Sequence, residues 1–375
     1  MKVLIASVSA GSGHMRAAQA LQAAFERVTP WNPVEHVDVM KYATGSYRRL
    51  YTDGYEFTVQ HMPSMWGRAF RYLERRRDPS WVKGMFGRIQ RRQFEGFFDH
   101  INRTRPDTII ATHFLIPQIL HHQFLGSSYS PRIECVVTDF RVHRVWAHEA
   151  VDQYYVACQR AAEELEDWGI PAHKISVTGI PIDPLFGETV SRIEVIKRLG
   201  LRPGIPTILI MTGGAGLHAI EKAITQIFKI KLPVQIIAVA GRNKKLQRRL
   251  TELNVPEHAG LSPLGFVNNI HELMSVSEIV ITKAGGLTVS EALTKGNVMV
   301  FFGSIPGQEE GNAEYITSQR AGLKALNLLD LKSLIHQLLV SPRMRAELRS
   351  NAFACATPRA GVTIAEKTLL YLAAA

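Results

Sequence analysis

The sequence predicts an α/β fold of two domains, each an open parallel sheet covered by helices. Short apolar segments alternate with amphipathic segments along the chain, which is the pattern of parallel strands joined by helical crossovers. A Pro- and Gly-rich stretch at about residues 179–206 interrupts this alternation, which then starts again. A chain of 375 residues is also too long for one ordinary hydrophobic core.

The first domain is predicted to span residues 1–178. Its strands are short apolar runs between polar turns: Lys2–Ser7, Val34–Asp38, Thr108–Ala111, Ile133–Val137 and Gln153–Val156. Apolar residues at helical spacing predict helices near Met15–Arg27 and Ala161–Trp168. A break at residues 179–184 and a short helix at Ser191–Leu199 indicate the connection to the second domain.

The second domain is predicted to span residues 179–357. Its strands are Thr207–Met211, Val234–Val239, Ile279–Thr282 and Val298–Phe301, and its helices include His218–Phe228 and Lys244–Leu253. We expect an apolar helix at about residues 358–375 to pack back on the first domain.

The composition is that of a soluble globular protein, with 46% hydrophobic and 21% charged residues. No apolar run approaches the roughly 20 residues that a membrane span requires. The run Val3–Val8 is short, so it predicts a first buried strand and not a signal peptide. Cys135, Cys158 and Cys355 form no CxxC motif or disulfide framework, which favours a reducing cytoplasm.

The net charge of +11 favours anionic partners, such as phosphorylated ligands, nucleic acid or an acidic membrane surface. Nine bases and two acids fall between Trp66 and Arg92, interleaved with aromatic side chains. This combination predicts a membrane-interface element. Its main residues are Trp66, Arg68, Arg75, Arg76, Arg77, Trp81 and Phe86. A solvated basic helix face is the alternative, and the lack of any RNA- or DNA-binding motif predicts no nucleic-acid partner.

The first glycine turn carries a candidate general base. Gly11 and Gly13 precede His14, but Arg16 stands where a dinucleotide fingerprint needs its third Gly or Ala, which argues against NAD. An imidazole at the start of the following helix can take a proton near neutral pH. A helix-capping or merely exposed histidine is the alternative.

A second polar segment, Val137–Trp146, follows a buried strand, where the sites of open α/β sheets are built. Asp139 is a candidate to act as a base, to orient one, or to hold an acceptor hydroxyl. The alternative is a loop aspartate that caps the next turn. His143 and Trp146 follow, and for His143 a surface position is an equal alternative.

The first turn of the second domain contains Gly213, Gly214 and Gly216, which let the backbone approach a diphosphate at a helix N-terminus. The same residues also fit a loose GxGxxG/A pattern, so a nicotinamide cofactor is the alternative. The next strand is followed by Arg242 and not by the acid that an NAD ribose requires. Arg242 is instead a candidate to face a leaving diphosphate.

The segment Gly265–Met274 predicts a short turn leading into a helix. The backbone of Phe266 and Val267 could pair with the edge of a nucleotide base. Simple packing of an apolar turn is the alternative.

The segment Thr282–Leu293 predicts the end of a strand, a glycine turn and a helix with an open N-terminus. Glu291 lies about two turns into that helix, where a carboxylate can accept hydrogen bonds from two vicinal hydroxyls. Gln308, Glu309 and Asn312 follow at a Pro-Gly turn. Together these residues predict a nucleotide-sugar site, with one more βα unit and a polar loop as the alternative.

Metal-binding signatures are missing from the sequence. No Asp is followed two residues later by another Asp, and no HExxH, GxSxG or P-loop motif occurs. We therefore expect no metal cofactor.

The order of these motifs resembles the processive diacylglycerol glucosyltransferases and monogalactosyldiacylglycerol synthases, relatives of the N-acetylglucosaminyltransferase that makes lipid II. The motifs are GSGH, VTDFRVHRVW, GGAG, AGRNKK, GFVNN, TKAGGLTVSEAL and PGQEEGN. The resemblance covers nearly the whole chain. The last two motifs are specific to the superfamily, and the first two point to the diacylglycerol branch. Plant members carry a third glycine where this chain has Ser12, a departure that leaves the conformation of this turn open.

The resemblance implies two Rossmann-like domains facing a central cleft, the GT-B type. It implies metal-free, inverting transfer of a hexose from UDP-glucose or UDP-galactose to the hydroxyl of diacylglycerol. By position, Gly213, Gly214, Gly216 and Arg242 would face the diphosphate, Phe266 and Val267 the uracil, Glu291 the ribose, and Gln308, Glu309 and Asn312 the sugar. His14 matches the family's catalytic base and Asp139 an acceptor-side acid. Gly13, His143, Trp146 and the basic aromatic segment fall on the acceptor and anionic-lipid side.

On this reading the protein is a peripheral, monotopic enzyme of the cytoplasmic face of the cell membrane. Two other readings stay open from the sequence. One is a UDP-N-acetylglucosamine transferase of the lipid II pathway, which needs a muramyl lipid acceptor. The other is a non-enzymatic, basic peripheral membrane protein with a degenerate sugar-nucleotide fold.

Overall fold

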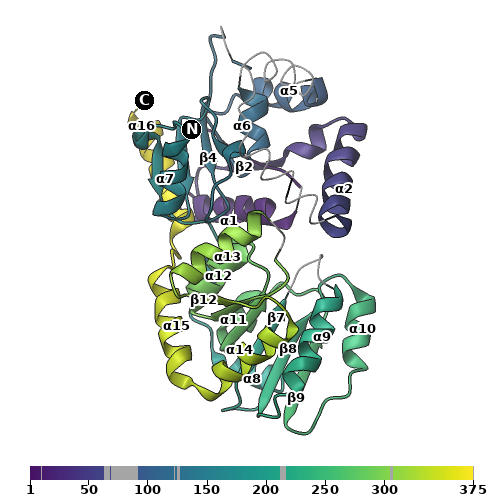
Figure 1. Ribbon diagram of the computed structural model, residues 1–375. Coiled ribbons are helices and arrows are strands. Elements are labelled where there is room, and N and C mark those ends of the chain that lie inside the picture. Colours follow the sequence, from purple (N-terminus) through teal and green to yellow (C-terminus); the bar gives the residue numbers. More distant parts are fainter. Residues whose placement is uncertain are drawn as a thin grey trace. The chain divides into compact units, whose positions relative to one another are not determined.

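The protein consists of two compact units, each built around one six-stranded parallel sheet (Figure 1). Unit 1 contains Met1–Pro184, Pro306–Gln308 and Thr357–Ala375, and unit 2 contains Leu185–Ile305 and Glu309–Ala356. The computed structural model describes residues 1–9, 11–62, 68, 92–121, 123–124, 127–211, 217–304 and 307–374. The predicted α/β fold class is confirmed.

The sheet of unit 1 has the strand order β2-β1-β3-β4-β5-β6. The strands are β1 (Val3–Ser7), β2 (Val34–Asp38), β3 (Thr108–Ala111), β4 (Arg132–Val136), β5 (Gln153–Val156) and β6 (Ile175–Val177). The chain leaves β1 for β2 on one side and then returns to place β3 on the other side. Loops that follow β1 and β3 therefore diverge, and the crevice between them is where such sheets bind ligands.

Helices and short 3-10 turns join these strands. The helices are α1 (Ser12–Val28), α2 (Gly45–His61), α5 (Glu95–Thr104), α6 (Leu115–Leu120), α7 (Gln159–Asp167) and α16 (Ala360–Ala374). The 3-10 turns are η1 (Val39–Tyr42), η2 (Arg144–Trp146), η3 (Ala172–Lys174) and η4 (Pro184–Gly187).

The sheet of unit 2 has the strand order β12-β11-β10-β7-β8-β9, with its own crevice between the ends of β7 and β10. The strands are β7 (Thr207–Met211), β8 (Val234–Val239), β9 (Ala259–Leu264), β10 (Ile279–Thr282), β11 (Val298–Phe301) and β12 (Gly322–Lys324). The helices are α8 (Arg192–Arg198), α9 (Leu217–Phe228), α10 (Lys244–Thr251), α11 (Ile270–Val276), α12 (Gly286–Lys295), α13 (Gln308–Ser318), α14 (Leu328–Val340) and α15 (Pro342–Ala354).

All nine predicted strands are present, and the described residues contain three further strands that were not predicted. The three are β6, β9 and β12, and each lies at an edge of its sheet. An edge strand is covered less completely than a central one, so its sequence need not be a continuous apolar run. In β9 the sequence AGLSPL even contains Pro263, which an edge position tolerates. Helix α1 begins at Ser12, three residues before the predicted start.

Helix α16 covers the sheet of unit 1 together with α1. In Figure 1 its yellow ribbon lies with the purple-to-teal elements of that unit. Ile364 and Ala365 of α16 join Leu21 and Phe25 of α1 in one buried apolar cluster. A Cβ added to Gly361 would come within 3.1 Å of the Ala24 Cβ atom, so the two helices approach closely.

A buried polar network also attaches α16 to the sheet. Glu134 on β4 is fully buried, and its Oε2 atom accepts hydrogen bonds from Thr368 Oγ1 at 2.5 Å and Tyr155 Oη at 3.1 Å. Its Oε1 atom accepts from Arg132 Nε at 2.9 Å. Burial raises the pKa of Glu134, and these donors oppose that rise. The carboxylate therefore depends on α16 for one of its partners.

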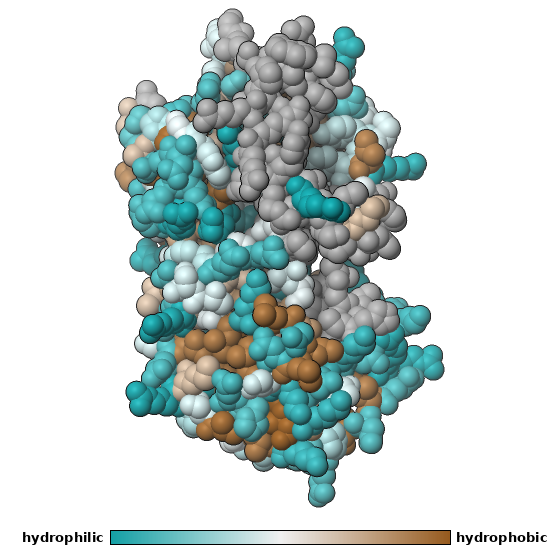
Figure 2. All heavy atoms as spheres, viewed as in Figure 1, coloured by the Kyte–Doolittle hydropathy of each residue, from teal (hydrophilic) through white to brown (hydrophobic). Residues whose placement is uncertain are grey.

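Apolar side chains are also exposed on both units. Trp31 and Leu50 of unit 1 are 80% and 76% exposed, and Leu326 and Leu329 of unit 2 are 78% and 74% exposed. Figure 2 shows such side chains interspersed with hydrophilic ones over unit 2. Within the described ranges, no helix has both the length and the apolar character needed to cross a membrane.

We predict that Thr368→Val destabilises the protein by about 1–3 kcal/mol, because a buried carboxylate loses a donor and keeps its desolvation cost. Urea-induced unfolding followed by circular dichroism measures this change. The control is Thr363→Val, the same substitution at a half-buried position of α16. Equal losses in the two variants would contradict the importance of the Glu134 network.

Candidate active site

The crevice of unit 1 holds His14 between the loops that follow β1 and β3. The chain turns at Gly11, whose φ of +85° favours glycine, and His14 lies in the first turn of α1. Its Nδ1 atom is 2.8 Å from the carbonyl oxygen of Thr112, the residue after β3, and 3.0 Å from Thr138 Oγ1. Thr112 Oγ1 donates in turn to the carbonyl oxygen of His14 at 3.0 Å. Three contacts thus tie the helix start to the ends of β3 and β4.

These contacts determine which ring nitrogen of His14 carries the proton. A carbonyl oxygen can only accept a hydrogen bond, so Nδ1 is the donor to Thr112. In the neutral ring, Nε2 is then the atom with the lone pair. Burial lowers the pKa of His14 to about 4, against a smaller opposing effect of the hydrogen bond to Thr112. At neutral pH the side chain is therefore an uncharged imidazole that can accept a proton at Nε2.

Aromatic rings surround His14. The ring of His113 makes an edge-on contact with it, with a centroid separation of 4.5 Å and an interplanar angle of 77°. The ring of Trp146 lies 6.1 Å from that of His14, and Phe114 packs against Trp146 at 5.8 Å. His113 was not predicted as a site residue. It directly follows Thr112 at the end of β3. This position indicates a site residue only when β3 is known to lie beside β1, because α1 and His14 follow β1.

The other predicted acceptor-side residues of unit 1 take different positions. Asp139 is buried next to Thr138, which contacts His14. His143 is also buried, so its interpretation as a surface residue is wrong. Its Nδ1 atom accepts a hydrogen bond from the Val145 amide at 3.1 Å and caps η2. Gly13 is half-buried, with open space where a Cβ atom would lie.

Several predicted site residues fall outside the described residues. Arg68 of the basic aromatic segment is described as an exposed helical residue. The others of that segment and the three glycines after β7 are not described: Trp66, Arg75, Arg76, Arg77, Trp81, Phe86, Gly213, Gly214 and Gly216.

The crevice of unit 2 contains the N-terminus of α12, at the end of β10. Gly285 caps this helix without a side-chain hydrogen bond, and the first turn holds no acid. The N-cap residue therefore gives the first amides of the helix no side-chain partner, while Glu309 Oε1 lies 4.0 Å from where a Cβ atom of Gly285 would be. Glu291 lies on the second turn and is fully buried.

The start of α13 is tied to the loop between β10 and α12. Glu309 Oε1 lies 2.6 Å from Lys283 Nζ, and both side chains are largely buried. Asn312 Nδ2 donates to the carbonyl oxygen of Ala284 at 3.0 Å. Gln308 is the first residue of α13, and its side chain is not described. The structure thus brings the segments of Glu309 and Asn312 to the start of α12 and adds Lys283, which the sequence analysis did not single out.

A third group of residues lies at the carboxyl ends of the strands of this sheet. The guanidinium carbon of Arg242, after β8, lies 5.3 Å from the ring centroid of Phe266, after β9. Gly241, with φ of +59°, allows the turn that leads to Arg242. Phe266 is 61% exposed although it is large and apolar, and Val267 beside it is half-buried. An exposed aromatic ring with a cation over it can stack on a planar, electron-rich ligand group.

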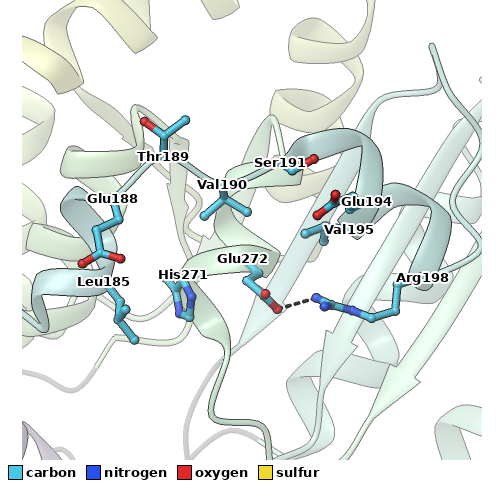
Figure 3. A pocket seen from close by; sticks show the side chains of 10 residues that line it. All are labelled: Leu185, Glu188, Thr189, Val190, Ser191, Glu194, Val195, Arg198, His271 and Glu272. Carbon is cyan, nitrogen blue, oxygen red and sulfur yellow. Dashed lines mark hydrogen bonds and ion pairs between the residues drawn. The ribbon is translucent and has the colours of Figure 1, made fainter.

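A separate pocket of about 260 Å³ lies between α8, α11 and the segment before α8 (Figure 3). It is lined by Leu185, Glu188, Thr189, Val190, Ser191, Glu194, Val195, Arg198, His271 and Glu272. Arg198 and Glu272 form an ion pair there. Three carboxylates against one arginine disfavour a diphosphate, and none of the predicted donor residues lines this pocket. We therefore assign it no part in the donor site.

Comparison with known structures places this fold in a class. MurG of Acinetobacter baumannii superposes with a TM-score of 0.60 at 15% identity, covering 97% of this chain and 98% of that chain. Anabaena Alr3699/HepE, in complex with UDP and glucose, superposes with a TM-score of 0.57 at 15% identity, covering all of both chains. The two Rossmann-like units thus have the GT-B fold of glycosyltransferases such as MurG.

Sequence comparison gives the relatives of each half of the chain. Residues 14–182 match the model described as "Monogalactosyldiacylglycerol (MGDG) synthase", and residues 207–358 match "Glycosyltransferase family 28 C-terminal domain". A processive diacylglycerol beta-glucosyltransferase of Bacillus pumilus is 28% identical over 357 residues, covering 93% of this chain and 90% of that protein. These matches confirm the resemblance inferred from the motifs, which is to the monogalactosyldiacylglycerol synthases and the processive diacylglycerol glucosyltransferases.

The low pKa of His14 makes stability depend on pH. Below its ordinary pKa of 6.5 the unfolded imidazole binds a proton, whereas the folded one stays neutral down to about pH 4. The free energy of unfolding therefore falls as the pH drops from 6.5 towards 4. We predict that His14 accounts for a loss of about 2 kcal/mol between pH 7 and pH 5.

Thermal and urea unfolding of the wild type and of His14→Gln at the two pH values measure this loss. The variant is expected to lose less stability on acidification, because residue 14 no longer titrates. Identical losses would show that His14 is not buried in its neutral form.

Proposed function

We propose that the protein is an inverting glycosyltransferase that moves a hexose from UDP-glucose or UDP-galactose to the hydroxyl of diacylglycerol. The observation that carries this proposal is the neutral imidazole of His14, whose Nδ1–H is held by Thr112 while Nε2 keeps its lone pair. The names of the family and of the Bacillus relative support diacylglycerol as acceptor. The complex of HepE with UDP and glucose supports a nucleotide-sugar donor for this fold.

The proposed reaction is a single displacement. The acceptor hydroxyl oxygen forms a bond to the anomeric carbon while the bond from that carbon to the UDP oxygen breaks, so the configuration inverts. The hydroxyl proton passes to His14 Nε2. The imidazolium that forms keeps its Nδ1–H bond to the Thr112 carbonyl, which favours the charged ring. We assign Asp139, buried beside Thr138, to the acceptor side.

Unit 2 is proposed to hold the donor. The open N-terminus of α12 and the guanidinium of Arg242 would offset negative charge that builds on the departing UDP. Gly213, Gly214 and Gly216 would let the backbone approach the diphosphate. Phe266 and Val267 would contact uracil, Glu291 the ribose, and Gln308, Glu309 and Asn312 the sugar. In this scheme the helix end and Arg242 do the work for which other transferases use a divalent metal.

The acceptor implies work at a membrane surface. We propose that the basic aromatic segment at residues 66–92 binds anionic phospholipid at the cytoplasmic face of the membrane. The support is its charge of nine bases against two acids and its interleaved aromatic residues. Electrostatic attraction of this kind weakens as the salt concentration rises.

The test is a transfer assay with purified protein and diacylglycerol vesicles, in which each UDP-sugar is supplied separately and products are separated by thin-layer chromatography. We expect one UDP-hexose to give glycosylated diacylglycerol, with a higher rate when anionic lipid is present and no loss in EDTA. His14→Ala is expected to lower kcat by about 100- to 10,000-fold, because the general base is removed.

His173→Ala, at an exposed position of η3, is the matched control and should keep wild-type activity. Release of UDP with a muramyl lipid but not with diacylglycerol would replace this function with the lipid II alternative. Absence of transfer to either acceptor, with membrane binding retained, would favour the non-enzymatic alternative.

The proposed donor site is tested by a substitution of Phe266. Phe266→Ala is expected to weaken UDP binding by about 5- to 30-fold, since an exposed aromatic contact worth about 1–2 kcal/mol is lost. Isothermal titration calorimetry with UDP measures the change. Leu326→Ala, which also truncates an exposed apolar side chain of unit 2, serves as the control. Equal affinity in the two variants would remove Phe266 from the donor site.

A further inference from the structure

His113 stands beside the proposed base, yet no step of the proposed reaction uses it. It is 3% exposed and is the second residue after β3, so the unit 1 crevice places it next to His14. Its ring meets the ring of His14 at 77° with centroids 4.5 Å apart. A buried polar side chain that contacts the proposed base is expected to have a function, and the contacts of His113 indicate what that function is.

The ring of His113 is fixed from several sides. Its Nδ1 atom accepts a hydrogen bond from the Leu115 amide at 3.1 Å, at the start of α6. The ring of Phe114 lies 4.2 Å from it, and the rings of Trp146 and Tyr51 lie at 6.3 Å and 6.4 Å. Because Nδ1 accepts a hydrogen bond, the neutral ring carries its proton on Nε2. The ring of His113 is therefore held in one position, because the backbone at the start of α6 binds its Nδ1 atom.

The ring of His14 is held less completely. Both of its hydrogen-bond partners, Thr112 O and Thr138 Oγ1, contact the same atom, Nδ1. Besides these bonds the ring is held by its covalent link to Cβ, so rotation about the side-chain torsions can still tilt it and move Nε2 on the far side. The edge-on contact with His113 opposes such a tilt because the two rings cannot turn independently at this separation.

We propose that His113 is a positioning residue, which fixes the ring plane of His14 so that Nδ1–H points at Thr112 and Nε2 points at the acceptor. This inference rests on the proposed function of His14 as the base. Two parts of His113 have separate tasks: the Nδ1 acceptor fixes the start of α6, and the ring fixes His14. Burial and the nearby His14 also hold the pKa of His113 well below its usual value, so it stays neutral and does not compete for the proton.

Two substitutions separate these tasks. His113→Asn keeps an acceptor for the Leu115 amide and removes the ring. His113→Phe keeps an aromatic ring and removes the acceptor. We expect His113→Asn to lower kcat by about 10- to 100-fold with an unchanged KM for the UDP-sugar, because Nε2 is misplaced while the donor site is intact. We expect His113→Phe to keep kcat within about threefold of wild type while its unfolding midpoint falls.

Unchanged kcat in His113→Asn would overturn the proposal. An equal loss of kcat in both folded variants would also overturn it, because the ring nitrogen atoms of His113, and not the presence of a ring, would then be what matters. Nitrogen NMR of His14 gives a second readout that does not depend on activity. We expect the Nδ1–H tautomer of His14 to be dominant in the wild type and depleted in His113→Asn. If the wild type transfers no sugar while this tautomer shift is observed, the proposed function fails and the positioning role stands.

Discussion

The order of strands in each parallel sheet is the constraint on which both sites depend. In unit 1 the chain runs from β1 to β2 and then places β3 on the opposite side of β1. Only this return brings the Thr112 carbonyl, 98 residues away in sequence, to the first turn of α1 that carries His14. In unit 2 the same return places β10 beside β7 and opens the N-terminus of α12 at the crevice. The strand order alone thus determines where the two crevices lie, whichever side chains line them.

The two crevices differ in their electrostatics, and the difference suits the two halves of the proposed reaction. The crevice of unit 1 is lined by rings and threonines, so burial holds His14 neutral and its proton stays on Nδ1. The crevice edge of unit 2 offers a helix N-terminus and the cation of Arg242. A base that must be uncharged before transfer benefits from desolvation, whereas a leaving diphosphate benefits from fixed positive charge. Each environment would be unfavourable for the other task.

Residues whose role depends on one short segment were predictable from the sequence, and residues whose role depends on strand order were not. The glycine turn before His14 and the glycine turn before α12 are local signals, because a strand, a turn and a helix follow one another directly. His113 and Lys283 gave no such signal, since their importance comes from neighbours distant in sequence. For His143 the sequence left a site position and a surface position open; burial excludes the surface position, and its Nδ1 atom caps η2. The unpredicted strands β6, β9 and β12 are edge strands whose burial is incomplete, so their apolar pattern is weak.

The position of the proposed base also depends on the C-terminal helix α16. His14 belongs to α1, and α1 is buried against α16, which begins at Ala360, after all of unit 2 in sequence. Until α16 docks, Leu21 and Phe25 would lack part of their apolar cover and Glu134 would lack Thr368. Closing a loop of this length costs conformational entropy, although that cost grows only slowly with loop length. The helix that carries the proposed base therefore has its full apolar cover only when α16 is docked on it.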